Sequence, residues 1–245
     1  MSGLSDQVHH PTPGRPVRLL RLDRAPRRNA LDLTTVDTLL DALEGDPEQP
    51  VVLGSTTPGI FCAGADLGVP DAQRTQISDR LYECYDAMVR RPGMVIAVID
   101  GAAVGGGAQL AAAADVRVAG PAARWRWIGP GHGLAVGAWI LPHLLGRSRA
   151  LDLTLTGRWL ELDEARQAGF VHRVAADAWT ATLALLDELG TADPAALSRV
   201  KRIATPPHLL EALDAERRRN QELWDGHAPD PPGSGTAASE AVPPI

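Results

Sequence analysis

Residues 94–110 read MVIAVIDGAAVGGGAQL. The first six, 94–99, are apolar throughout, which is typical of a strand that is buried on both faces of a sheet. Gly105–Gly107 then separate this strand from an alanine-rich run, 108–114, that has the pattern of a buried helix. A buried strand, a glycine turn and a helix in this order predict one unit of an α/β protein.

The same alternation of strands and helices extends over the first two thirds of the chain. Strands are predicted at 17–22, 50–54 and 115–119, and helices at 33–43 and 71–91. Farther along, the apolar spacing predicts helices at 136–145, 149–155, 162–168, 176–189, 194–203 and 208–225. The sequence therefore predicts an α/β core with parallel strands, followed by a helical region.

Composition divides the chain into four parts. Residues 1–16 are predicted to be a flexible start, 17–190 the α/β core, and 191–226 a helical region suited to oligomerisation. Residues 227–245 are rich in Pro, Gly, Ser and Ala, a composition typical of a disordered tail.

Overall composition excludes several functional classes. The chain has 245 residues, 44% of them hydrophobic and 22% charged, as in an ordinary globular protein with a sizeable core. A net charge of −6 argues against broad binding of nucleic acid. The longest uncharged apolar stretch, 102–114, is too short to span a membrane, and residues 1–16 have no secretory-signal core. Cys62 and Cys84 match neither a disulfide framework nor a zinc site. We therefore expect a cytoplasmic protein without a bound metal.

A second glycine turn, GIFCAGADL at 59–67, follows the strand predicted at 50–54. Glycines allow close backbone approach, and a helix that begins at such a turn leaves several N–H groups unpaired. These donors suit an anion or an oxygen that becomes negative during a reaction. The alternative is that Gly105–Gly107 only relieve crowding between strand and helix, and the pattern alone leaves both interpretations open.

Other catalytic motifs are absent from the sequence. The turn lacks the spacing of G-x-G-x-x-G, and the chain contains no G-K-[ST], G-x-S-x-G, H-E-x-x-H or C-x-x-C. Nucleotide-binding, serine hydrolase, zinc protease and thiol redox functions lose their main support. Backbone donors are then the principal catalytic resource.

The segments FCAGADL (61–67) and DGAAVGGGAQL (100–110) resemble the two signature segments of the crotonase superfamily, the enoyl-CoA hydratase/isomerase family. Residues 24–31 resemble its coenzyme A segment, 115–119 its next strand, and 157–171 a later helical stretch. The resemblance covers about 17–224 in order. It implies a spiral of ββα units closed by a C-terminal helical region, in trimers or dimers of trimers.

The resemblance implies that the substrate is an acyl thioester of coenzyme A. Because coenzyme A is part of this substrate, no separate cofactor is expected. The backbone N–H groups of Ala65 and Gly106 would form the oxyanion hole, and one such donor typically contributes on the order of 3 kcal/mol to lowering the barrier. Asp66 is expected to be structural or helix-capping. Arg24, Arg27 and Arg28 suit the phosphates of coenzyme A. The substrate-binding positions carried over are Arg27, Arg28, Ala30, Ala63, Gly64, Asp66, Leu67 and Gly105.

Two positions depart from the family's hydratases, which use two glutamates. The first position holds Gln109, whose amide cannot exchange a proton near neutral pH. The second falls on Gly129, which has no side chain, and a shift of one residue gives Ile128 or Pro130. The sequence therefore resembles members that lack both glutamates, and it predicts weak or no hydratase or isomerase activity.

Three hypotheses follow. The first is an acyl-CoA-binding protein of lipid metabolism, acting as a carrier or regulator without hydratase chemistry. The second is an active lyase, isomerase or thioester hydrolase that uses His132, Gln109 or another residue, although His132 also fits a hydrogen-bonded turn position. The third is a structural subunit that no longer binds a ligand. Two intact glycine turns favour the first hypothesis over the third.

Overall fold

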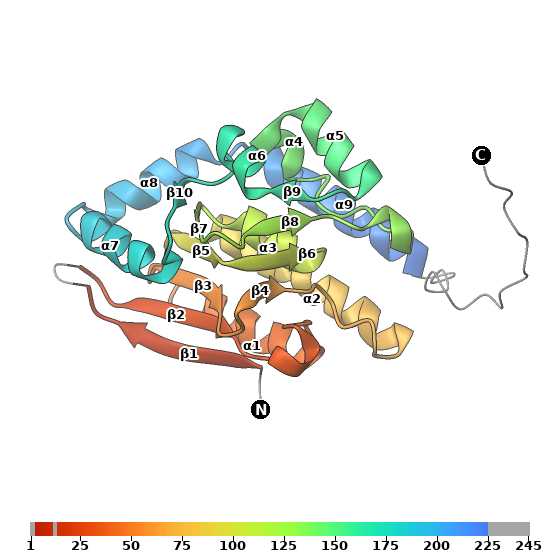
Figure 1. The fold of residues 1–245 in the computed structure, drawn as a ribbon, viewed down its shortest axis with the longest axis horizontal. Coiled ribbons are helices and arrows are strands. Elements are labelled where there is room, and N and C mark those ends of the chain that lie inside the picture. Colours follow the sequence, from red (N-terminus) through yellow and green to blue (C-terminus); the bar gives the residue numbers. More distant parts are fainter. Residues whose placement is uncertain (1–2, 12–13, 225–245) are drawn as a thin grey trace, which may run out of the picture.

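A computed structural model describes residues 3–11 and 14–224. Its larger sheet has six strands in the order β1-β2-β3-β5-β7-β10 (Figure 1). Strands β2 to β10 run parallel, and β1 is antiparallel to β2. The strands are β1 (Leu4–His9), β2 (Val17–Leu22), β3 (Val51–Ser55), β5 (Val95–Ile99), β7 (Val116–Ala119) and β10 (Arg173–Val174).

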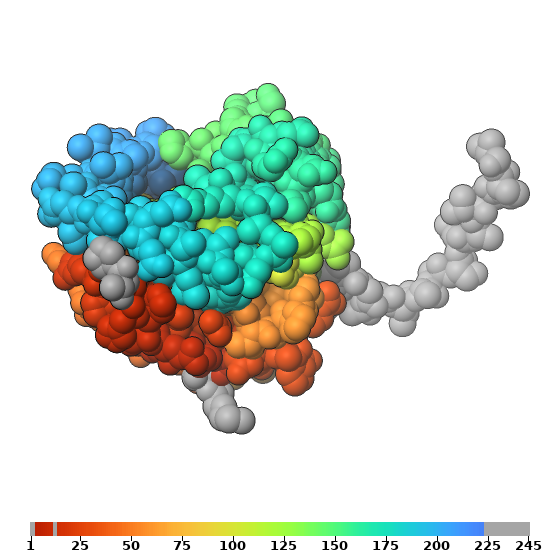
Figure 2. All heavy atoms as spheres, turned by 60° about the vertical axis from the view of Figure 1, so that its left-hand side comes forward, coloured from red at the N-terminus to blue at the C-terminus, as the bar shows by residue number. Residues whose placement is uncertain are grey.

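Both faces of this sheet are covered, as the sequence of β5 predicts. Val95, Ala97 and Ile99 join the main core beneath three helices, α1 (Leu33–Glu44), α2 (Asp71–Arg90) and α3 (Gly106–Ala113). Ile96 and Val98 alternate to the opposite face, where they pack against α7 (Ala178–Gly190). Figure 2 shows α7 (cyan) lying directly against the first strands (red). The alternation confirms a doubly covered α/β core.

A second sheet holds the strands that lead into the helices. Its order is β4-β6-β8-β9, with β4, β6 and β8 parallel and β9 antiparallel. Consecutive strands alternate between the two sheets before the chain enters α2 and α3, which gives the predicted ββα units. Because β4 and β6 are neighbours, the glycine turns that follow them come out side by side. The strands are β4 (Gly59–Cys62), β6 (Gly101–Val104), β8 (Arg124–Arg126) and β9 (Leu160–Glu161).

The C-terminal helix α9 (His208–Trp224) returns to the core and packs along α2. Arg217 of α9 forms ion pairs with Asp79 (2.7 Å) and Glu83 (3.1 Å) of α2. No described helix is long and apolar enough to cross a membrane. The remaining helical segments are η1 (Ala25–Arg27), η2 (Pro130–His132), α4 (Leu141–Leu145), α5 (Arg147–Thr156), α6 (Leu162–Gln167) and α8 (Pro194–Ala204).

Two sequence predictions are wrong in part. The flexible start predicted for residues 1–16 is contradicted at Leu4–His9, which pairs with β2 over its whole length. Half of its residues are exposed and only Leu4 and Val8 are apolar, which is too weak a signal to predict this edge strand. The helix predicted at 136–145 begins only at Leu141, since Gly137 has a φ of +86° and interrupts it. The tail predicted at 227–245 lies outside the described residues.

Candidate functional site

The two glycine turns meet backbone to backbone. Gly64, after β4, has a φ of +89°, a conformation that favours glycine. A Cβ atom on Gly64 would lie 2.8 Å from the carbonyl oxygen of Val104 and 3.3 Å from the nitrogen of Gly106. The turns are therefore in direct contact, and a side chain at Gly64 would force them apart.

Two backbone N–H groups are left free where these turns meet. The backbone N–H and C=O groups of Leu31 form hydrogen bonds with the two residues that flank Ala65 in the chain. The Gly105 N–H donates to the carbonyl of Arg126. Within the described residues, the N–H groups of Ala65 and Gly106 donate to no protein acceptor. Gly106 is also the first residue of α3, so the positive end of the helix dipole adds to its N–H. A pair of such donors suits an oxygen that gains negative charge.

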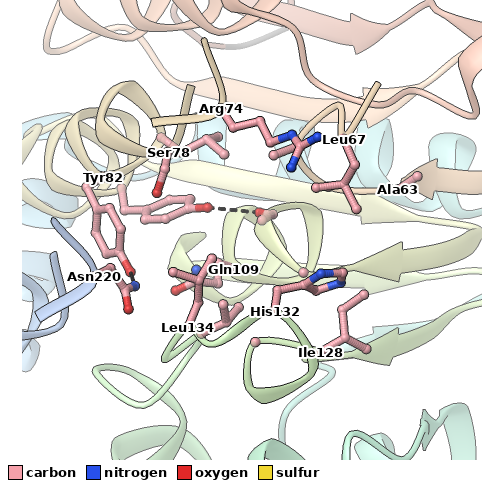
Figure 3. A pocket seen from close by; sticks show the side chains of 18 residues that line it. Ala63, Leu67, Arg74, Ser78, Tyr82, Gln109, Ile128, His132, Leu134 and Asn220 are labelled. Carbon is pink, nitrogen blue, oxygen red and sulfur yellow. Dashed lines mark hydrogen bonds between the residues drawn. The ribbon is translucent and has the colours of Figure 1, made fainter. Parts of the chain in front are cut away.

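Both donors open onto a pocket of about 140 Å³ (Figure 3). Its walls come from the two turns, from α2 and α3, from residues 128–136 and from α9. In Figure 3, Tyr82 and Asn220 lie side by side at one end, Gln109 lies centrally, and His132 and Ile128 lie toward the other end. The structure thus brings nine of the sequence-predicted site residues around one pocket, namely Ala63, Gly64, Ala65, Leu67, Gly105, Gly106, Gln109, Gly129 and His132.

Gln109 is held by its amide oxygen. Oε1 accepts hydrogen bonds from the backbone N–H of Gly137 (3.1 Å) and from the indole Nε1–H of Trp139 (2.7 Å). The side chain is almost fully buried. With its oxygen occupied twice, Gln109 is fixed in orientation and has no basic atom to offer the pocket.

Behind the pocket lies a carboxylate that sequence reasoning missed. Glu216, on α9, is only 5% exposed. It accepts hydrogen bonds from the hydroxyl of Tyr82 (2.9 Å) and from the backbone N–H groups of Gly137 (3.1 Å) and Trp139 (2.9 Å). Burial raises the pKa of Glu216 to about 7, against the opposing effect of these hydrogen bonds. Asn220 completes the cluster by donating to the Tyr82 hydroxyl (2.7 Å).

A helical pattern marks this cluster in the sequence. Leu209, Leu213, Glu216 and Asn220 follow one another at spacings of four, three and four, and all are buried. These four residues, two apolar followed by two polar, therefore lie on one inward-facing side of α9. A charged residue on such a face is the signal that points to Glu216.

Arg74 of α2 also lines the pocket without having been predicted. Its Nε donates to the carbonyl of Val69 (3.0 Å), and Nη1 pairs with Asp71 (3.0 Å). These contacts hold the guanidinium group of Arg74 at the wall of the pocket.

Gly129 and His132 differ in how they reach the pocket. A Cβ atom on Gly129 would lie 2.5 Å from the carbonyl oxygen of Leu134 and 2.7 Å from a methyl group of Val136. No glutamate can stand at 129 unless this loop moves. His132, in η2, is half-buried and lines the pocket. Its imidazole forms no hydrogen bond within the described part of the chain, so the structure does not support a hydrogen-bonded turn role for this side chain.

The predicted coenzyme A arginines do not line the pocket. Arg24 binds Asp66 (2.8 Å) and the carbonyl of Ala30 (2.7 Å), so it has a structural role. Burial opposes the charge of Asp66, but hydrogen bonds from Arg24 and from a backbone N–H keep its pKa below the ordinary value. Asp66 is therefore structural and does not cap a helix. Arg27 and Arg28 are exposed, and neither they, Ala30 nor Asp66 line the pocket.

The fold and the site together define a class of protein: two-sheet ββα units that present a pair of free backbone N–H groups in the wall of a largely apolar pocket. The chain belongs to the enoyl-CoA hydratase/isomerase family, whose sequence model matches residues 14–226. That family binds acyl-CoA thioesters.

Individual relatives agree with this membership. The chain is 33% identical over 220 residues to "Probable enoyl-CoA hydratase echA6" of Mycobacterium tuberculosis (strain CDC 1551 / Oshkosh), covering 85% of this chain and 87% of the relative. It is 34% identical over 213 residues to the mouse (Mus musculus) "Enoyl-CoA hydratase domain-containing protein 2, mitochondrial", covering 78% and 70%.

Solved structures show the same fold. The enoyl-CoA hydratase from Bacillus anthracis superposes with a TM-score of 0.74 at 25% identity, covering 89% of this chain and 90% of that one. The enoyl-CoA hydratase from Bacillus halodurans gives a TM-score of 0.80 at 19% identity, covering 91% and 95%, and supports the fold alone.

Proposed function

We propose that this protein binds acyl-CoA thioesters of lipid metabolism, holds their carbonyl oxygen between the N–H groups of Ala65 and Gly106, and hydrates them weakly or not at all. The observation that carries this proposal is the combination of two free donors with a pocket wall that contains no carboxylate among the described residues. Donors alone bind and polarise a thioester, but they neither remove nor deliver a proton.

Hydration of an enoyl thioester needs a base that activates water and an acid that protonates the acyl chain. Each such group typically contributes about 10²–10⁴-fold to the rate. Gln109 supplies neither, because its oxygen is occupied and its nitrogen is a donor that does not titrate. Losing both groups should therefore reduce turnover by at least about 10⁴-fold.

Glu216 does not replace the missing groups. Both of its oxygens accept hydrogen bonds, and the side chain does not line the pocket. The hydroxyl that donates to the carboxylate belongs to Tyr82, which itself lines the cavity. We therefore assign Glu216 to holding the walls and not to proton transfer with the substrate.

A substitution at Gly106 tests the binding mode. A Cβ atom there would lie 2.9 Å from Leu81 and 3.3 Å from the Tyr85 hydroxyl, so Gly106→Val fills the space beside the donors. Calorimetry should show crotonyl-CoA binding to the wild type and at least tenfold weaker binding to Gly106→Val. Gly131→Ala is the matched control, because a Cβ atom at Gly131 meets nothing within 4 Å. Equal affinities of wild type and Gly106→Val would contradict the proposal.

A second candidate function is an active lyase, isomerase or thioester hydrolase that uses His132. It is favoured by one observation, the imidazole that lines the pocket and has no hydrogen-bond partner among residues 3–11 and 14–224. His132→Gln keeps a polar side chain but cannot titrate near neutral pH. If turnover of an acyl-CoA substrate is found and this variant abolishes it, the second candidate replaces the first.

Assembly and location complete the proposal. We expect trimers or dimers of trimers built with α8 and α9, in the cytoplasm, with coenzyme A entering only as part of the substrate. Light scattering on the purified full chain gives the number of subunits directly.

A further inference from the structure

The pocket beside the glycine turns has one open end and one closed end. At the open end, the lining residue Leu67 is 50% exposed and Arg74 is half-buried. At the closed end, Tyr82 and Asn220 are each only 3% exposed, and Figure 3 shows them on the side of the pocket away from Leu67. Coenzyme A is large and carries charged phosphates that are costly to bury, so it must remain at the open end. The acyl chain of a bound thioester then points toward Tyr82.

The polar groups of the closed end are occupied by one another. The hydroxyl of Tyr82 donates to Glu216 and accepts from the Asn220 amide. The same amide donates to the carbonyl oxygen of Ala135 (2.7 Å), and its oxygen accepts from the Ala135 N–H (2.9 Å). The side-chain donors of Tyr82 and Asn220 are therefore all used within the protein. A ligand meets no free donor from them, which favours an apolar end of the acyl chain.

Packing holds the ring of Tyr82 in place. Its edge meets Tyr85, with the ring centroids 5.7 Å apart and the planes at 78°, and Tyr85 in turn stacks on Trp139 at 6.0 Å. All three rings are buried. Displacing Tyr82 would disturb this stack and leave buried polar groups on α9 without their partner, and both changes are costly. The closed end should therefore keep its position when a ligand binds.

The space between the glycine turns and this wall is small. The Tyr85 hydroxyl donates to the carbonyl oxygen of Gly106 (3.1 Å), and Tyr82 packs against the ring of Tyr85. The wall thus lies one aromatic ring beyond the oxygen-binding donors. The whole cavity measures about 140 Å³. A buried apolar cavity of about 150 Å³ holds a ligand the size of benzene, with about six carbons. The pocket accordingly fits acyl chains of up to about six carbons.

We propose that Tyr82 is a specificity-determining residue that ends the acyl pocket, so that the protein takes acyl-CoA thioesters of about four to six carbons and discriminates against longer ones. The inference rests on the proposed function, because it assumes that the thioester carbonyl binds at Ala65 and Gly106. Up to the wall, each additional buried methylene should tighten binding about fourfold. A longer chain must displace the Tyr82 ring, and this overpacking should weaken binding by at least about tenfold.

Calorimetry with butyryl-, hexanoyl-, octanoyl- and dodecanoyl-CoA tests the proposal. The wild type should bind hexanoyl-CoA most tightly and octanoyl-CoA at least about tenfold more weakly. Tyr82→Ala removes the ring, so the maximum should move to octanoyl-CoA or beyond. Tyr82→Phe keeps the ring, so the maximum should stay at hexanoyl-CoA. Gln73→Ala, at an exposed position of α2 outside the pocket, is the matched control and should keep the wild-type order of affinities.

Three results would overturn the inference. An affinity of the wild type that keeps rising up to dodecanoyl-CoA would show that the pocket sets no limit. A maximum that stays at hexanoyl-CoA in Tyr82→Ala would assign the limit to another residue. Failure of all the thioesters to bind the wild type would refute the proposed function itself, whereas the first two results leave it standing. If Tyr82→Ala does not fold, Asn220→Ala, which shortens the other side chain of the closed end, should move the maximum in its place, and an unchanged maximum would contradict the proposal.

Discussion

The two ends of the pocket are built in different ways. At one end, Ala65 and Gly106 offer backbone N–H groups from two turns that follow neighbouring strands. At the other, Tyr82 of α2 and Asn220 of α9 bond to one another and Tyr82 bonds to Glu216, which lies behind the wall. The central Gln109 of α3 joins this polar cluster through Gly137 and Trp139. The first end depends on backbone conformation and the second on tertiary packing. Oxygen binding can therefore be retained while the groups for proton transfer are replaced.

Replacing Glu216 should disrupt the hydrogen bonds of the polar cluster and leave the two glycine turns intact. Glu216→Ala leaves the Tyr82 hydroxyl and the Trp139 N–H without their acceptor, and an unpaired buried donor costs about 1–3 kcal/mol. We expect the free energy of unfolding to fall by about 3 kcal/mol in urea titrations. Glu211→Ala, at an exposed position of the same helix, is the control and should change it by less than about 0.5 kcal/mol. An equal effect of both variants would contradict the anchoring role.

The sequence predicts the two ends unequally. The glycine turns and the parallel core follow from local patterns such as residues 94–110, because consecutive residues determine both. The network around Gln109 depends on α9, more than a hundred residues farther along the chain, and no local pattern pairs Trp139 with Gln109 or Glu216. Edge strand β1 escapes prediction for another reason: it pairs with β2 over its whole length, while Leu4 alone of its two apolar residues packs against the core and Val8 is exposed.

Stability should depend on pH through the same carboxyl group. The pKa of Glu216 is raised from 4.5 to about 7, so the folded protein binds this proton more tightly than the unfolded chain. The contribution is complete below about pH 4.5 and is lost as pH rises through about 7, by an amount on the order of 3 kcal/mol. Urea titrations between pH 5 and 8 should show this decline. The Glu216→Gln variant should lose the part of this pH dependence that comes from Glu216. If its free energy of unfolding declines with pH as steeply as that of the wild type, the decline belongs to other groups.

The smallest effect is expected outside the pocket, on the side of the glycine turns. Arg27 is exposed, and a coenzyme A phosphate that reaches it remains in water, so the contact is worth less than about 1 kcal/mol. Arg27→Gln should weaken acyl-CoA binding two- to fivefold at low salt and have no effect in 0.5 M salt. Arg166→Gln, exposed on α6, is the control. If the loss persists at high salt, Arg27 has a buried contact that the present geometry does not provide.

The central claim is that the turn end binds acyl-CoA while the pocket lacks the groups that hydrate it. The most direct test follows the absorbance of the conjugated thioester in crotonyl-CoA at protein concentrations where calorimetry shows saturation. We predict saturable binding with turnover at least about 10⁴-fold below the order of 10 s⁻¹ that is typical of enzymes. Hydration of the bound thioester at ordinary enzyme rates would contradict the account.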